Sequence, residues 1–172
     1  MRRAFITLLI TGVWVLSSVG CASYKLGPTN GATAGARSVQ FRPFNNLTPE
    51  PRFVEAVGSA LRKNLQRDGT YALNTHDDGD IVVTGSIVRY DRDPLAFQPR
   101  DILTVRDYRV TMVAKVTAVE RRGGRILFDR EVTGRTTLRV GADQASVERQ
   151  TLPVLADDLA RNVVALLSEG TW

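Results

Sequence analysis

Alternating apolar and polar residues mark the strands of this chain. The clearest alternation begins at Tyr108, after which apolar side chains occupy every second position as far as Ala118. Because successive side chains of a strand point to opposite faces of a sheet, this pattern predicts a strand with one buried face. Arg121–Gly124 follow as a hairpin turn. The return strand carries apolar residues in matching phase at Ile126, Phe128, Val132, Leu138 and Val140. Further strands are predicted at residues 38–44, 71–73 and 80–90.

Two segments repeat apolar residues at helical spacing instead. Residues 51–68 form the first, and Gly69 is suited to end that helix. Its apolar positions are Phe53, Val54, Val57, Leu61 and Leu65. Residues 143–168 form the second, with Asp143 as a candidate N-cap. Pro153 lies inside that pattern and predicts either a kink or a second helix start.

The order of these elements is strand, helix, several strands, helix, with no internal repeat. It predicts a single two-layer α+β domain over residues 38–172, in which two helices pack on a roughly four-stranded, mostly antiparallel sheet. Pro94 and Pro99 indicate a loop over residues 91–101. Gly85 lies inside a predicted strand, where glycine is typical of close packing or a bulge.

The first twenty residues have the layout of a secretory signal peptide. Arg2 and Arg3 precede an apolar stretch that ends in small residues, and Cys21, the only cysteine, follows Gly20. This position resembles the lipobox of a bacterial lipoprotein, in which the cysteine becomes an acylated N-terminus. The alternative is a chance cysteine after an ordinary signal peptide. Residues 21–37, rich in glycine and alanine, then form a flexible tether.

Composition excludes several functional classes. The 172 residues carry 23 Lys+Arg against 18 Asp+Glu, a net charge of +5. Arg2 and Arg3 belong to the predicted signal peptide, so nucleic-acid binding loses its main compositional support. One cysteine excludes an internal disulfide and a cysteine-rich metal site, and we expect no cofactor. His76, in a turn with Asp77 and Asp78, could hold a metal or act as an acid–base group, but a solvated turn is favoured because no second histidine supports it.

Catalysis has no positive signal either. Asp157 and Asp158 are adjacent on a predicted helix, so their carboxylates point in different directions. No glycine cluster matches a phosphate-binding loop. We therefore expect a binding protein rather than an enzyme.

Arginine dominates the positive charge, because only three of the 23 basic residues are lysine. Arg100, Arg106 and Arg109 flank the predicted 91–101 loop, and the hairpin brings Arg135 and Arg139 toward the same end. Clusters of arginine suit multivalent recognition of phosphate or carboxylate. The alternative is a solvated, partly salt-bridged surface, since aspartates are interspersed among these arginines.

The chain resembles the LPS-assembly lipoprotein family (LptE-like) in the order of its motifs. These are the Cys21–Gly27 tether, the segment Val39–Pro49, a helix ending at Gly69, and strands beginning at Gly79 and Asp107. The resemblance implies an outer-membrane lipoprotein on the periplasmic face that plugs a lipopolysaccharide-translocating β-barrel, assists its assembly and binds lipopolysaccharide. By that resemblance the best-matching ligand positions are Arg100 or Arg106, and Arg139; Arg109 joins them as a candidate.

The sequence leaves three functions open. The first is this barrel-associated lipopolysaccharide-assembly role, with Cys21 lipidated and Arg100, Arg106, Arg109 and Arg139 as ligand-binding candidates. The second is a lipoprotein that regulates peptidoglycan synthesis or serves a secretion pore, for which the tether is short. The third is a small hydrolase, which the residue census disfavours.

Overall fold

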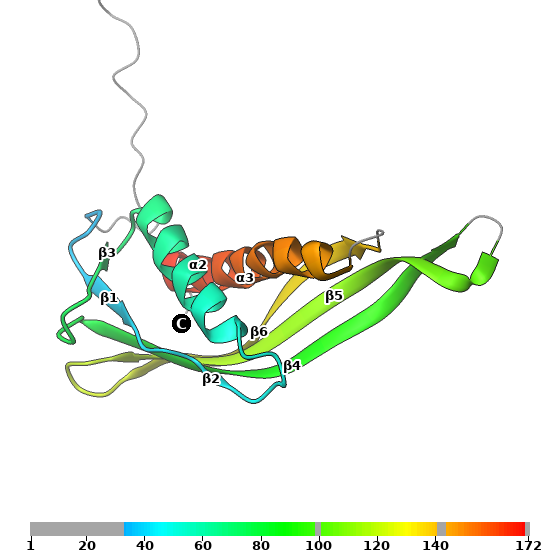
Figure 1. Cartoon of the computed structure of the whole chain (residues 1–172). Helices are drawn as coiled ribbons and strands as arrows, with labels where there is room; N and C mark the ends of the chain where they lie inside the picture. Colours follow the sequence, from blue (N-terminus) through cyan, green and yellow to red (C-terminus); the bar gives the residue numbers. More distant parts are fainter. Residues whose placement is uncertain (1–32, 99–100, 141–143, 171–172) are drawn as a thin grey trace, which may run out of the picture.

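The computed structural model describes residues 33–98, 101–140 and 144–170. Within these ranges the chain forms six strands and two helices (Figure 1). They are β1 (Ser38–Phe41), β2 (Asn45–Asn46), α2 (Phe53–Asp68), β3 (Ala72–Leu73), β4 (Ile81–Gln98), β5 (Asp101–Glu120), β6 (Ile126–Arg139) and α3 (Gln144–Glu169). The two-layer α+β class predicted from the periodicity is confirmed.

The sheet is larger and more mixed than the sequence indicated. Its order is β3-β1-β4-β5-β6, with β2 also paired to β4. The long strands β4, β5 and β6 are antiparallel, as predicted. The short strands differ, because β1 runs parallel to β3 and to β4, and β2 runs parallel to β4. Parallel neighbours need a crossover connection, and α2 supplies it between β1 and β3.

The predicted loop over residues 91–101 is wrong, because β4 and β5 continue through most of it. Asp93 pairs with Arg109, and Phe97 with Val105, although register shifts interrupt the ladder after Pro94. The strands β1 and β2 reach β4 only as far as Ile87, so β4 is an edge strand beyond that point. An edge strand tolerates proline since its outward N–H has no partner to lose, which is why Pro94 does not end the strand.

Beyond the pair Asp107–Arg139, where β6 ends, only β4 and β5 remain. We call this two-stranded extension, residues 97–98 and 101–106, the arm. Figure 1 shows it projecting away from the helices.

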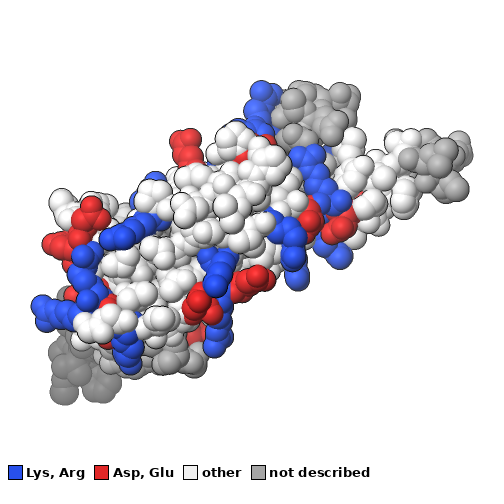
Figure 2. Space-filling view, turned by 90° about the horizontal axis from the view of Figure 1, so that it is seen from below, with Lys and Arg blue, Asp and Glu red and all other residues white. Residues whose placement is uncertain are grey.

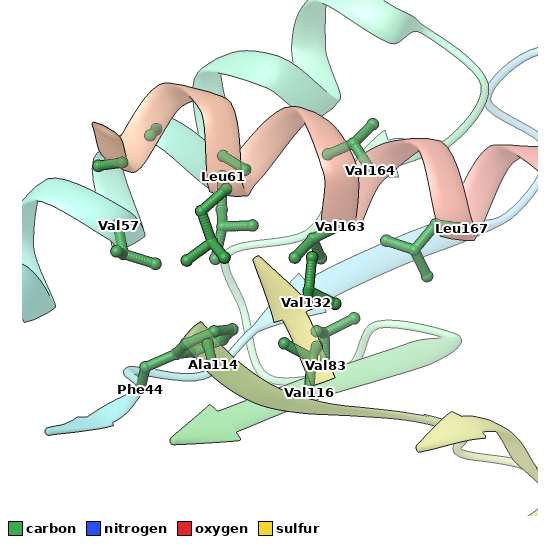
Figure 3. Packing of buried hydrophobic residues seen from close by; sticks show 14 of the residues in the cluster. Phe44, Val57, Leu61, Val83, Ala114, Val116, Val132, Val163, Val164 and Leu167 are labelled. Carbon is green, nitrogen blue, oxygen red and sulfur yellow. The ribbon is translucent and has the colours of Figure 1, made fainter. Parts of the chain in front are cut away.

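Both helices cover the same face of the sheet, and the hydrophobic core lies between the two layers (Figure 1). Every second residue of β5 from Val110 to Ala118 is buried there, as the alternation predicted. Figure 3 shows Val57 and Leu61 of α2 pointing from above toward the sheet. The core also contains Val163 and Leu167 of α3 and Val83, Ala114, Val116 and Val132 of the sheet.

Two glycines allow unusually close packing. A β-carbon on Gly85 would lie 2.6 Å from the Phe44 ring, so the close packing expected at this position is confirmed. A β-carbon on Gly134 would lie 2.7 Å from the backbone nitrogen of Leu159, so α3 rests directly on β6. Gly134 interrupts the apolar pattern of the return strand because a larger residue there would collide with the backbone of α3.

Helix α2 ends as predicted, with Gly69 in the left-handed conformation and its N–H donating to the Leu65 carbonyl. Helix α3 includes Pro153 within one continuous helix, so no second start occurs. Asp143 lies outside the described residues. Ile126 was predicted to face the core but is 62% exposed, because a register shift at Ala118/Val119 brings Leu127 inward instead.

Candidate anion-binding face

The side of the sheet opposite the helices carries polar and charged residues. Figure 2 views the molecule from that side and shows basic and acidic residues distributed around a largely uncharged centre. The intervening residues of β5, including Arg109, Thr111 and Lys115, point to this side because their neighbours point into the core. We call it the open face. It leaves the side chains of three long strands accessible to a ligand or partner.

The register of β5 and β6 gathers three arginines on the open face. Arg109 lies opposite Thr137, and Arg135 and Arg139 stand two residues to either side of Thr137 on the same strand. Diagonal neighbours on one sheet face are roughly 7–8 Å apart, within reach of arginine side chains. Among the described residues, the Arg109 and Arg135 guanidinium groups have no hydrogen-bond or ion-pair partner. They are available for an external anion.

A fourth arginine joins this group through Asp107, which lies opposite Arg139. Arg106 Nε donates to Asp107 Oδ2 at 2.9 Å, and Arg139 Nε donates to Asp107 Oδ1 at 2.9 Å. Asp107 is only 6% exposed, whereas the side chains of Arg106 and Arg139 are 45% and 75% exposed. We call Arg106, Arg109, Arg135 and Arg139 the arginine cluster.

The charge state of Asp107 follows from these contacts. The hydrogen bond from Arg139 is the largest influence and lowers the pKa of Asp107. Burial opposes this effect, and the Arg106 hydrogen bond reinforces it, so the net pKa is below the usual aspartate value. At neutral pH the carboxylate is ionised and accepts one hydrogen bond from the Nε–H of each of the two guanidinium groups.

The structure brings together three of the four predicted ligand positions. Arg106 and Arg139 meet at Asp107, and Arg109 lies on the same face. Arg100 lies outside the described residues, as does Cys21. Arg135 is not among the four predicted ligand positions, although its four-residue spacing from Arg139 places both on one face of a strand.

Other arginines fit the alternative of a salt-bridged surface. Arg89 pairs with Asp91 at 2.9 Å, and Arg92 stacks on the Tyr90 ring at 5.2 Å from its centroid. At the opposite hairpin tip, Arg121 donates to the Gly79 carbonyl at 2.8 Å. These side chains have internal structural partners, which distinguishes them from Arg109 and Arg135.

The residues weighed for catalysis have structural roles or lie in solvent. His76 is exposed, and the described residues contain no group of three or more potential metal ligands around it or elsewhere. Asp157 and Asp158 both pair with Arg161, at 2.9 and 2.8 Å. Asp158 also accepts a hydrogen bond from the backbone N–H of Arg135 at 2.8 Å. The described helices include none with the length and apolar character needed to cross a membrane.

Solved structures with a similar fold share little sequence with this chain. A protein of Xanthomonas campestris superposes with a TM-score of 0.61 at 9% identity, covering 85% of this chain and 91% of its own. A hypothetical protein of Chlamydia trachomatis gives 0.56 at 10% identity, covering 77% and 96%. PelC of Paraburkholderia phytofirmans gives 0.50 at 13% identity, covering 78% and 90%. At these identities the likeness concerns the fold alone.

Sequence comparison is more specific. No curated protein matches this chain. The profile of the LptE family, described as lipopolysaccharide-assembly, matches residues 36–167, which include all the described strands and nearly all of α3. LptE is a family of non-enzymatic accessory lipoproteins that associate with the lipopolysaccharide transport machinery. The chain belongs to the LptE lipopolysaccharide-assembly family.

Proposed function

We propose that this protein is an outer-membrane lipoprotein that binds lipopolysaccharide through its arginine cluster and both plugs and helps assemble the β-barrel that translocates it. The observation that carries the binding role is the gathering of Arg109, Arg135 and Arg139 on the open face, with Arg106 bonded to the adjacent Asp107. The guanidinium groups of Arg109 and Arg135 have no partner among the described residues. Guanidinium groups recognise phosphate with directional, charge-assisted hydrogen bonds, and lipopolysaccharide is rich in phosphate.

Attachment to the membrane rests on Cys21. Each buried methylene of an acyl chain contributes about 0.8 kcal/mol, so several chains hold a protein durably on a bilayer. The end of the predicted 21–37 tether is bonded to the domain, because the Gly35 N–H donates to the Thr70 carbonyl at 3.0 Å and Arg37 pairs with Glu120. A flexible chain of 12 residues, the length of segment 21–32, has a root-mean-square span of roughly 17–21 Å. A domain on so short a tether stays close to the membrane surface, where a barrel partner is accessible.

The plugging role is supported by the one-sided fold. The helices cover one face of the sheet, while the open face and the arm remain available to contact a surrounding wall (Figure 1). Leu95 and Phe97, next to and within the arm, are 46% and 48% exposed, which leaves apolar surface near its end. Isolated two-stranded hairpins are marginally stable in water, so the arm gains from such a contact.

Binding is tested with the full chain and purified lipopolysaccharide, using its dephosphorylated form as a control ligand. The double variant Arg109→Gln/Arg135→Gln should lower affinity without affecting the fold, because neither guanidinium has an internal partner. Arg62→Gln/Arg67→Gln is the matched control, since it removes the same charge from exposed positions on α2. Equal losses in the two double variants would show that net charge, not the open face, governs binding.

Localisation and partnership need separate measurements. Mass spectrometry of the processed protein should find Cys21 as an acylated N-terminus, and an unmodified thiol there would contradict the lipoprotein assignment. Extraction of membranes in mild detergent, followed by affinity purification, should recover a large β-barrel. Reproducible recovery of peptidoglycan enzymes alone would refute the barrel role.

A further inference from the structure

Asp107 is an unusual residue to find in an anion-binding face. Its carboxylate is nearly buried, carries a negative charge, and lies between two of the four clustered arginines. We propose that Asp107 is a positioning residue, which holds Arg106 and Arg139 in the orientation that receives a phosphate group. This inference rests on the proposed function, because it assigns a role within the same site.

The geometry of the two hydrogen bonds supports this role. Both arginines approach Asp107 through Nε, one at each carboxylate oxygen. An arginine side chain has five N–H donors, so each guanidinium keeps its four terminal N–H groups for other acceptors. Those groups form the edge that binds phosphate in two-point contacts.

Pre-ordering of the side chains explains why a carboxylate would be retained here. A free arginine samples many rotamers, and fixing one such side chain on binding costs about twofold to tenfold in affinity. With 45% and 75% of their side chains exposed, Arg106 and Arg139 would otherwise move freely in solvent. Since the pKa of Asp107 is lowered by these same contacts, the carboxylate stays ionised and the ordering persists at neutral pH.

The substitution Asp107→Asn separates positioning from simple charge. Removing a negative charge from the open face should strengthen anion binding if charge alone matters. If Asp107 positions the arginines, affinity for phosphorylated lipopolysaccharide should instead fall, by about fourfold to a hundredfold, because both side chains lose their order. A gain in affinity, or no change, would overturn the inference.

Asp93→Asn is the matched control. Asp93 is exposed and lies opposite Arg109 in the same ladder, so its loss removes the same charge near the same cluster. We expect this variant to bind as tightly as the wild type or slightly more tightly. A loss equal to that of Asp107→Asn would mean that both aspartates act alike, which also overturns a specific role for Asp107.

Folding of each variant is checked by thermal unfolding. Should Asp107→Asn fail to fold, Asp107→Glu replaces it, because glutamate keeps the charge but displaces the carboxylate by one methylene. If Asp107 positions the arginines, Asp107→Glu should bind more weakly than the wild type. If only charge matters, Asp107→Glu should bind as tightly as the wild type. Wild-type protein that binds phosphorylated and dephosphorylated lipopolysaccharide equally would refute the proposed function and this inference with it. Phosphate-dependent binding that Asp107 variants do not weaken would refute the inference only.

Discussion

Replacing Gly134 with alanine tests how α3 is seated on the sheet. The added β-carbon would lie 2.7 Å from the Leu159 nitrogen and 2.8 Å from the Leu155 carbonyl oxygen. Both are backbone atoms of α3, so no side-chain rotation relieves the overlap and the helix itself must move. Overpacking of this kind costs about 1–3 kcal/mol.

The same displacement would weaken two hydrogen bonds that tie α3 to the outer edge of β6. Asp158 accepts from the Arg135 N–H, and Asn162 donates to the Thr133 carbonyl, each at 2.8 Å. Each hydrogen bond contributes about 0.5–1.5 kcal/mol to stability. Alanine in place of glycine lowers the conformational entropy of the unfolded chain, which offsets about 0.4–1 kcal/mol of the loss. Central values give a net loss of about 3 kcal/mol in the free energy of unfolding.

Urea denaturation of the full chain, followed by circular dichroism, measures this loss. With a slope of about 2 kcal/mol/M, the midpoint should fall by about 1.5 M. Gly58→Ala is the control, because a β-carbon there meets nothing closer than the Arg62 guanidinium at 3.8 Å. That helical substitution should raise stability by about 0.5–1 kcal/mol. If Gly134→Ala is as stable as the wild type, the close seating of α3 on β6 is wrong.

Three further predictions address the core and the site. Leu61→Ala removes a fully buried side chain and should lower stability by about 2–5 kcal/mol in the same assay; a loss below 1 kcal/mol would contradict its central position. Tyr71 donates to the Leu167 carbonyl at 3.2 Å, and burial raises its pKa above 10.0, so stability should decline as pH rises beyond about 10. In urea titrations at several pH values, Tyr71→Phe should reduce this decline of the unfolding free energy with pH. An equal decline in the variant would contradict the role of Tyr71. Arg139→Gln should raise the pKa of Asp107 toward its ordinary value in an NMR titration, because Arg139 is the largest cause of the lowering; an unmoved pKa would exclude that pairing.

Local sequence identifies most of the arginines of the candidate site. It does not predict how their side chains are arranged around Asp107. Arg106, Arg109 and Arg139 could be selected because arginines crowd one end of a predicted hairpin. Asp107 could only be seen as one of several interspersed acids. Its burial between two arginines depends on the β5–β6 register, which sets it directly opposite Arg139. A one-residue slip would place the two side chains on different faces.

What the sequence by itself determined is the identity of the main elements and their buried faces. Periods of two and of about 3.6 residues are local properties of the sequence, so β5, α2 and α3 can be predicted from consecutive residues alone. Which strands become neighbours, in which direction they run and where the sheet has its edges were decided only in the tertiary structure. Parallel pairing of β1 with β4 joins Val39 to Ile81, and the edge position of β4 lets Pro94 remain in a strand. Such choices depend on contacts between residues far apart in the chain, and a local pattern specifies which side of an element is covered without specifying what covers it.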